Sequence, residues 1–494
     1  MKIGKPSVLI EKLSIPAISP IPTLDAEPRP LAISAKLLYG VGEIPITVLM
    51  VLSGLFILFF YYSVMGLPAV LVGVGLSVTL GLDAITDPLI GHLSDRSRNR
   101  FGRRHVFMLP GALGMGPCFY LLFSPPRSLG HTGLFMWLLG SMIALRATSA
   151  IYRIPYLGLG AEISRDYDDR TSTMAVRAVF GLLGTLAAAG LSFLLFFPAT
   201  ADGSEPKLQY SGYPHLGLAF GALMTVSGLI SCFGTLGHRT VGTGKSAGGP
   251  SFLSAFRISM QNTEFRKLWG SSTTFFLAVV LNASMAIQYF TWYARVSGGG
   301  TLSAIQASFY IGALLGVFQW MALSRRAEKR TLCMVAVTAT AALLLMATLL
   351  IGEGRLFGTG HAMPLIVGSV IGGMFASAVW VIPPSMVADV ADTDELKTGL
   401  RREGIYFGIA NFGEKIAAGG ALFLSGALLS LFGKLSHGVP QGAPAATPYL
   451  GILYGAVPAV LLMVSLLFII PYRLNRRTVH GIQRELAARR AGPV

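Results

Sequence analysis

Two aspartates lie one helical turn apart in a stretch of the chain that is otherwise apolar. Asp83 and Asp87 fall within residues 67–93, with Thr86 beside them. Residues four apart share one face of a helix, and a carboxylate in hydrocarbon costs about 2.5 kcal/mol or more. The set therefore predicts a cation site, either for Na⁺, which prefers hard oxygen ligands, or for H⁺, which needs a carboxylate. The alternative is a structural ion pair with Arg or Lys of a neighbouring helix.

The composition indicates a polytopic membrane protein. Of 494 residues, 53% are hydrophobic and only 13% are charged, and 59 are glycine. The net charge of +16 does not indicate nucleic-acid binding, because Lys and Arg cluster in short loops between apolar runs. Cys118, Cys232 and Cys333 are scattered singly and have no metal-ligand spacing, so we expect packing roles and no disulfide framework.

Hydropathy predicts twelve membrane spans. They cover approximately residues 36–62, 67–94, 104–124, 131–160, 172–198, 213–236, 267–294, 302–323, 331–352, 361–388, 403–433 and 446–472. The loops after every second span hold most of the Lys and Arg, whereas the opposite loops hold about one each. This asymmetry predicts a multi-pass protein of the cell (inner) membrane with both termini in the cytoplasm.

An internal repeat indicates two halves. Ile154-Pro155 to Ala161-Glu162 is similar to Ile382-Pro383 to Ala388-Asp389, a little under half the chain later. Two parallel six-helix halves follow, with a substrate site between them at mid-membrane depth. The predicted organisation is a flexible N-terminal tail, a first half, a central cytoplasmic loop, a second half and a basic C-terminal tail. Their bounds are 1–35, 36–236, 237–266, 267–472 and 473–494.

Four motifs occur in order at the expected helix ends. They are Tyr39-Gly-Val-Gly42, Asp83-Ala-Ile-Thr-Asp87-Pro to Asp95-Arg96 with Phe101-Gly-Arg103-Arg104, Ile154-Pro-Tyr156 to Asp169-Arg170, and Lys397-Thr-Gly-Leu-Arg-Arg402-Glu-Gly404. Together they resemble the glycoside-pentoside-hexuronide cation symporters, the melibiose permease-like family of the major facilitator superfamily.

The resemblance implies an all-α membrane protein with twelve transmembrane helices in two pseudo-symmetric halves. It also implies symport of a sugar, glycoside or related acidic organic solute with Na⁺ or H⁺ by alternating access, by a monomer in the lipid bilayer, with no other cofactor. A lysophospholipid symporter is the alternative, because such relatives share the Asp-Ala-Ile-Thr-Asp-Pro segment and lack the sugar-binding aspartates. A membrane-embedded enzyme is not expected, because no HExxH or GxSxG motif is present.

The resemblance also assigns individual residues. Asp83 and Asp87, with Thr86, match the cation site, where Na⁺ is one candidate ligand. Lys415 matches a lysine that faces the cavity, although a Lys snorkelling to the membrane surface is the alternative. We place Tyr156 and Asn411 in the same substrate site.

Thr47 and Arg153 stand where members that bind galactosides carry aspartates, so a neutral sugar held by two carboxylates is not expected. Arg153 follows Arg146 by seven residues, which puts both on nearly one helix face, and a guanidinium suits a carboxylate, sulfonate or phosphate. Alternatively, Arg153 pairs with Asp83 or Asp87, which would weaken or abolish ion dependence.

Two further sets are assigned by residue type. Trp292 and Tyr289 could stack on a ring-shaped substrate, or could be aromatic residues of the membrane interface. Charged loop residues are expected to latch the halves on the cytoplasmic side in the outward-facing state. These are Asp95, Arg96, Arg103, Arg104, Glu162, Arg170, Asp389 and Arg402.

Overall fold

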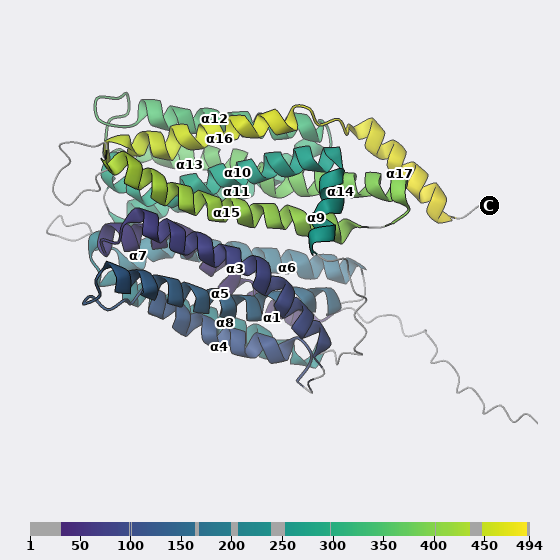
Figure 1. Ribbon diagram of the computed structural model, residues 1–494, viewed down its shortest axis with the longest axis horizontal. Coiled ribbons are helices and arrows are strands. Elements are labelled where there is room, and N and C mark those ends of the chain that lie inside the picture. Colours follow the sequence, from purple (N-terminus) through teal and green to yellow (C-terminus); the bar gives the residue numbers. More distant parts are fainter. Residues whose placement is uncertain are drawn as a thin grey trace, which may run out of the picture.

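The computed structural model describes residues 31–97, 99, 101–163, 167–198, 206–238, 252–296, 298–400, 402–434 and 447–491, and all regular structure within them is helical. The helices form two groups, which lie one above the other in Figure 1. We call α1 to α8 the first half and α10 to α16 the second half.

The first half occupies the lower part of Figure 1. Its helices are α1 (Ile33–Val41), α2 (Ile44–Phe59), η1 (Phe60–Val64), α3 (Ala69–Arg96), α4 (His105–Leu122), α5 (His131–Glu162), α6 (Tyr167–Leu186), η2 (Ala187–Leu191), α7 (Ser192–Phe196), η3 (Pro206–Leu208), α8 (Gly212–Gly234) and η4 (Leu236–His238). The break between α1 and α2 falls just before Pro45, which lacks the N–H that a continuous helix would need.

The second half occupies the upper part of Figure 1. Its helices are α10 (Thr263–Gln288), η5 (Tyr289–Tyr293), α11 (Gly299–Ser324), α12 (Lys329–Leu350), α13 (Ala362–Ala376), α14 (Ala378–Thr398), α15 (Glu403–Lys434), η6 (Thr447–Tyr449), η7 (Ile452–Ala456) and α16 (Val457–Ile469). Single π-helical turns occur in four of the membrane-crossing segments: η2 lies between α6 and α7, η1 and η5 follow α2 and α10, and η7 precedes α16.

Twelve helical segments cross the membrane. Among the described residues, eleven are long and apolar enough to span it by length and composition alone. The twelfth is α3, whose 28 residues extend over roughly 42 Å at 1.5 Å per residue. The part of α3 before its acids, Ala69–Asp83, is itself apolar. The acidic helix is therefore a full membrane crossing.

Two helices lie outside the predicted spans. Helix α9 (Phe252–Gln261) lies in the segment expected to be a loop, and α17 (Arg476–Ala491) in the expected basic tail. Asn262 separates α9 from α10, because its side-chain oxygen accepts from the N–H groups of Glu264 and Phe265 at 3.1 and 3.2 Å. Hydropathy did not indicate either helix, because both are too short or too polar to span a membrane.

Helices α9 and α17 lie at the same end of the bundle, on the right of Figure 1. Arg476 at the start of α17 donates to the carbonyls of Ser324 and Arg325, at 2.7 and 2.8 Å, and thereby caps the last turn of α11. Arg103 and Arg104 lie in the loops at this end, which we call the basic end.

The halves touch closely at the end opposite the basic end. Helices α3 and α15 pack along each other there, and a Cβ on Gly73 would lie 2.8 Å from the carbonyl oxygen of Leu422. Ser77 Oγ donates to the Gly419 carbonyl at 2.7 Å, and Ser303 Oγ donates to the Gly190 carbonyl at 2.5 Å. Glycines that let helix backbones approach are the usual means of tight packing in membranes. This end is closed.

Candidate functional site

A cavity of about 2240 Å³ lies between the halves. Asp83, Asp87, Arg153 and Lys415 all line it, as does Arg146. It also extends along the bundle to Ala255 of α9 and Gly404 of α15, at the basic end. Most of the remaining lining is aliphatic or aromatic. The charged residues therefore form a polar patch in an otherwise apolar cavity.

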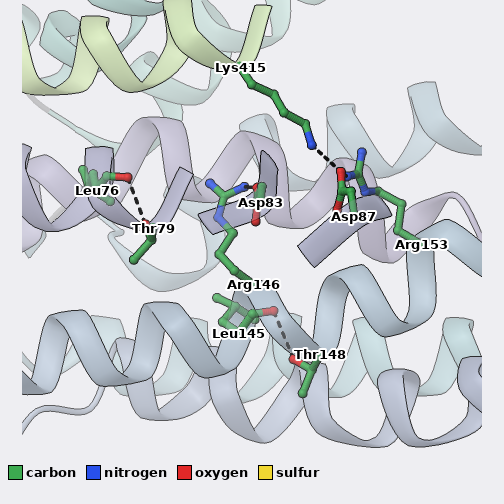
Figure 2. Close-up of polar contacts among 9 residues, drawn as sticks. All are labelled: Leu76, Thr79, Asp83, Asp87, Leu145, Arg146, Thr148, Arg153 and Lys415. Carbon is green, nitrogen blue, oxygen red and sulfur yellow. Dashed lines mark hydrogen bonds and ion pairs between the residues drawn. The ribbon is translucent and has the colours of Figure 1, made fainter. Parts of the chain in front are cut away.

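Each acid of α3 is paired with an arginine of α5. Arg146 Nη1 donates to Asp83 Oδ2 at 3.0 Å, and Arg153 Nη2 donates to Asp87 Oδ2 at 2.6 Å. The dashed lines in Figure 2 mark the contact at each acid. Helices α3 and α5 cross the membrane in the same direction, because one helix that returns, α4, lies between them in the chain. Asp83 therefore meets Arg146, and Asp87 meets Arg153.

Lys415 reaches Asp87 from the second half. Its ammonium donates to the same Asp87 oxygen that Arg153 contacts, and Figure 2 shows it descending from α15 to that carboxylate. The Lys415 and Asp87 side chains are 25% and 15% exposed, so this ion pair is partly desolvated. Lys415 faces the cavity and does not extend to the membrane surface. The pair is a direct electrostatic link between the two halves.

The five ion-paired groups carry one uncompensated positive charge, and Glu414, which also lines the cavity, forms no ion pair with them. Arg146, Arg153 and Lys415 supply three cations, whereas Asp83 and Asp87 supply two carboxylates. Two unit charges 4 Å apart interact by about 4 kcal/mol at an effective dielectric constant near 20, before any desolvation cost. An added anion would neutralise the cluster, and an added cation would raise its excess charge. The arrangement favours an anionic ligand.

Two side-chain oxygens on this part of α3 have no hydrogen-bond partner among the described residues. Thr86 Oγ1 and Asp87 Oδ1 are buried and accept no hydrogen bond from the described residues. Both carboxylates are occupied by protein cations in this conformation. The pairing of Arg153 with Asp87 is the alternative that the sequence analysis left open. Ion binding at Asp83, Asp87 and Thr86 stays a prediction.

The remaining residues assigned to the substrate site fall into two groups, those that line the cavity and those that do not. Asn411 lines the cavity one turn before Lys415. Thr47 does not line it, because its hydroxyl donates back to the Ile44 carbonyl at 3.1 Å. Tyr156 is fully buried in the first half, where its ring stacks on Tyr39 at 4.7 Å and its hydroxyl donates to the Tyr39 carbonyl. Thr47 and Tyr156 thus pack the first half in this conformation.

Tyr289 and Trp292 also lie away from the cavity lining. Tyr289 is fully buried and stacks on Tyr454 at 4.0 Å. Both residues belong to the π-helical turn η5, which ends this membrane crossing. Asn282, earlier on the same crossing, does line the cavity and donates to the Tyr454 carbonyl at 2.8 Å.

Sequence reasoning missed two ion pairs. It used Arg146 only to locate the helix face of Arg153. Two arginines seven residues apart on one span and two acids four residues apart on another were the signal that each acid pairs with one arginine. It also missed the contact of Arg177 with Glu43 at 3.1 Å, which fixes the α1–α2 break against α6. In both cases the partner lies more than 60 residues away, where helix periodicity gives no information.

The contacts that the structure describes for Arg104, Asp389 and Arg402 lie within single halves. Arg104 donates to Ser94 at 2.7 Å in the first half. In the second half, Asp389 accepts from Lys329 at 2.6 Å and Arg402 lies 3.7 Å from Asp394. Arg96 and Arg103 lie at the same basic end, and the side chains of Asp95, Glu162 and Arg170 lie outside the described part of the structure. A latch between the halves stays a prediction for the opposite conformation.

Two relatives of known name match almost the whole chain. The putative glycoside/cation symporter YagG of Escherichia coli is 26% identical, over 93% of this chain and 96% of its own. The sodium-dependent lysophosphatidylcholine symporter 1-A of Danio rerio is 24% identical, over 95% of this chain and 91% of its own. Sugar-type and lipid-type symporters are thus about equally similar to this sequence.

Solved structures support the same fold. A bacterial homologue of the human lysosomal transporter Spinster, in an inward-facing and unoccupied conformation, superposes with a TM-score of 0.64 over 91% of this chain and 97% of its own, at 14% identity. The profile of the MFS/sugar transport protein family matches residues 38–476. With twelve crossings, two halves and a central cavity, this chain belongs to the MFS/sugar transport protein family of the major facilitator superfamily.

Proposed function

We propose that this protein is a symporter that imports an organic anion with a sizeable apolar part, together with a cation, by alternating access. The observation that carries the proposal is the ion-paired cluster, in which Arg146, Arg153 and Lys415 exceed Asp83 and Asp87 by one charge. The cavity around it is mostly apolar, and Glu414 is the other acid in its lining. A guanidinium and an ammonium that meet at one carboxylate oxygen can also hold a substrate carboxylate, sulfonate or phosphate. No catalytic step is proposed.

A neutral sugar fits this cavity poorly. Sugar hydroxyls need many donors and acceptors, since each unpaired buried polar group costs about 1–3 kcal/mol. Near the charged cluster the lining offers few of them, chiefly Asn411, Asn282 and Ser149, among aliphatic neighbours such as Leu49 and Leu157. An acidic glycoside with an apolar aglycone would satisfy both the charge and the apolar walls.

An anionic single-chain lipid is the second candidate. The apolar lining continues along α12 and α13 through Met346, Met363 and Val367, which are suited to an acyl chain and offer nothing to a sugar ring. The similarity to a relative named for lysophosphatidylcholine supports this candidate, as the similarity to YagG supports a glycoside. Both candidates share the anionic group that the cluster would bind.

The proposal also includes the orientation of the protein in the membrane and the movement of its two halves. The excess of Arg and Lys at the basic end supports a cytoplasmic location for that end and for both termini. With that orientation, the structure is closed to the outside and its cavity faces the cytoplasm. Residues 36–236 and 267–472 would move as bodies joined by 237–266, and the gate residues would latch them in the outward-facing state. We expect a monomer in the inner membrane.

The test is uptake into liposomes that contain the purified protein, under an imposed H⁺ or Na⁺ gradient. The panel contains hexuronides, sulfonated sugars, aryl glycosides with and without a carboxylate, and lysolipids with anionic or zwitterionic headgroups. We expect accumulation only of anionic members, and only with a cation gradient. Accumulation of neutral glycosides alone, or uptake that no cation gradient drives, would contradict the proposal.

A further inference from the structure

We infer that Arg146 is a resident cation: its guanidinium fills the place beside Asp83 that a monovalent metal ion would otherwise occupy, so the wild-type protein does not bind Na⁺ there. The inference rests on the proposed function in one respect, because it names which coupling cation the symporter excludes. It assigns Arg146 as the residue that sets this ion selectivity.

The geometry keeps the Arg146 guanidinium bound to the Asp83 carboxylate. Asp83 is 6% exposed, and its Oδ2 accepts from Arg146 Nη1 at 3.0 Å. A guanidinium stays charged at any physiological pH, and a cation tethered to α5 cannot be diluted as a free ion can. Dissolved Na⁺ would have to displace a partner that is always present at high local concentration.

The oxygens around Arg146 form an incomplete metal site. A hard cation takes several oxygen ligands, and within one turn of Asp83 the helix offers Asp87 Oδ1 and Thr86 Oγ1, both buried and unpartnered among the described residues. Asp87 Oδ2 is already held by Arg153 and Lys415. Removal of the Arg146 guanidinium would leave an uncompensated buried carboxylate, with two unpartnered oxygens within one turn of it on the same helix as candidates for further Na⁺ ligands.

The net charge of the ion-paired groups supports the same inference. With Arg146 present the five ion-paired groups sum to one positive charge, and bound Na⁺ would raise that to two; Glu414 also lines the cavity but is paired with none of them. Without Arg146 they sum to zero, so one Na⁺ restores the wild-type balance. Arg153 is not equivalent, because Lys415 still neutralises Asp87 when Arg153 is removed. The proton is then the cation left to the proposed symport.

The deciding experiment measures binding of radioactive Na⁺ to the purified, detergent-solubilised protein, with no organic substrate present. Thermal unfolding in NaCl and in choline chloride gives a second readout. The variants are wild type, Arg146→Ala, Arg146→Lys, Arg153→Ala and the double variant Arg146→Ala/Asp83→Asn. We expect saturable Na⁺ binding, and a rise in Tm of several degrees in NaCl, for Arg146→Ala alone.

Each result decides the inference. Saturable Na⁺ binding by wild type or by Arg146→Lys would overturn it, as would a folded Arg146→Ala that binds none. Na⁺ binding that persists in the double variant would place the ion elsewhere and overturn it too. If Arg146→Ala does not fold, Arg146→Gln removes the charge but retains most of the volume and is read in the same way. Failure of every anion in the liposome panel would refute the proposed function but leave these binding results standing.

Discussion

We expect the ion pair between Lys415 and Asp87 to join the halves only while the cavity faces the basic end, so its removal should favour the opposite conformation. Replacement of Lys415 by Met keeps the length of the side chain but removes the charge. Asp87 retains Arg153 at 2.6 Å, and therefore no carboxylate is left unpaired. The perturbation thus acts on the contact between the halves more than on the stability of the first half.

The expected magnitude follows from burial. Exposed ion pairs contribute about 0.2–1 kcal/mol, and breaking a fully buried pair costs about 3–5 kcal/mol, mostly from the orphaned charge. The Lys415 and Asp87 side chains are 25% and 15% exposed, and no charge is orphaned, so about 1–2 kcal/mol is appropriate. That corresponds to a roughly 5–30-fold rise in the outward-facing population.

The assay uses a reporter cysteine at the closed end. Ser303 bonds across the halves to Gly190, so a cysteine at position 303 reacts with a charged maleimide only when that end opens. The background lacks Cys118, Cys232 and Cys333. Lys415→Met should raise the alkylation rate about 5–30-fold, and the same change in an Asp87→Asn background should have little further effect. Equal rates in wild type and Lys415→Met, or a full effect without Asp87, would refute the reasoning.

The other predictions concern the same cavity and its two ends. Asp83→Asn and Asp87→Asn should each abolish cation-driven accumulation in liposomes while the protein stays folded in the membrane; wild-type uptake in both would refute the coupling site. Arg153→Lys keeps the charge but loses the two-pronged guanidinium, so substrate affinity at saturating cation should fall about tenfold, equivalent to about 1.4 kcal/mol. Equal affinities in wild type, Arg153→Lys and Arg153→Ala would rule out direct recognition. A side chain at Gly426 would meet Gly73 Cα at 3.2 Å, so Gly426→Val should hold the closed end open and raise reporter alkylation. Arg402→Ala should shift the population toward the inward-facing state if the latch exists, with unchanged reporter alkylation as the contrary result.

The sequence was sufficient to predict the crossings and the buried acids. Long apolar runs and loop charge do not depend on tertiary contacts, so the twelve crossings and the placement of Asp83 and Asp87 within the membrane could be predicted. Helix periodicity also put Arg146 and Arg153 on nearly one face. It could not say which helix that face meets, and the pairing with α3 therefore appears only in the structure.

The aromatic residues show a second limit. Trp292 and Tyr289 were assigned to the substrate site by residue type, but both lie in the π-helical turn η5 and neither lines the cavity. Residue type could not show that Tyr289 packs inside the second half, because its stacking on Tyr454 depends on the tertiary fold. Tyr156 differs, because the resemblance placed its motif correctly on α5, and only the stacking on Tyr39 shows that its ring faces the interior of the first half.

The position of the charged cluster links substrate binding to the movement of the halves. Under the proposed function, an anion that enters the cavity competes with Asp87 for Arg153 and Lys415, and these are also the groups that connect Asp87 to the second half. An anion bound by both cations would loosen the link between α3 and α15, and a proton on the released carboxylate would remove its charge. The apolar lining would leave either change uncompensated by water. Anion and proton would therefore stabilise each other in the site, which is the condition for coupled transport in one direction or the other.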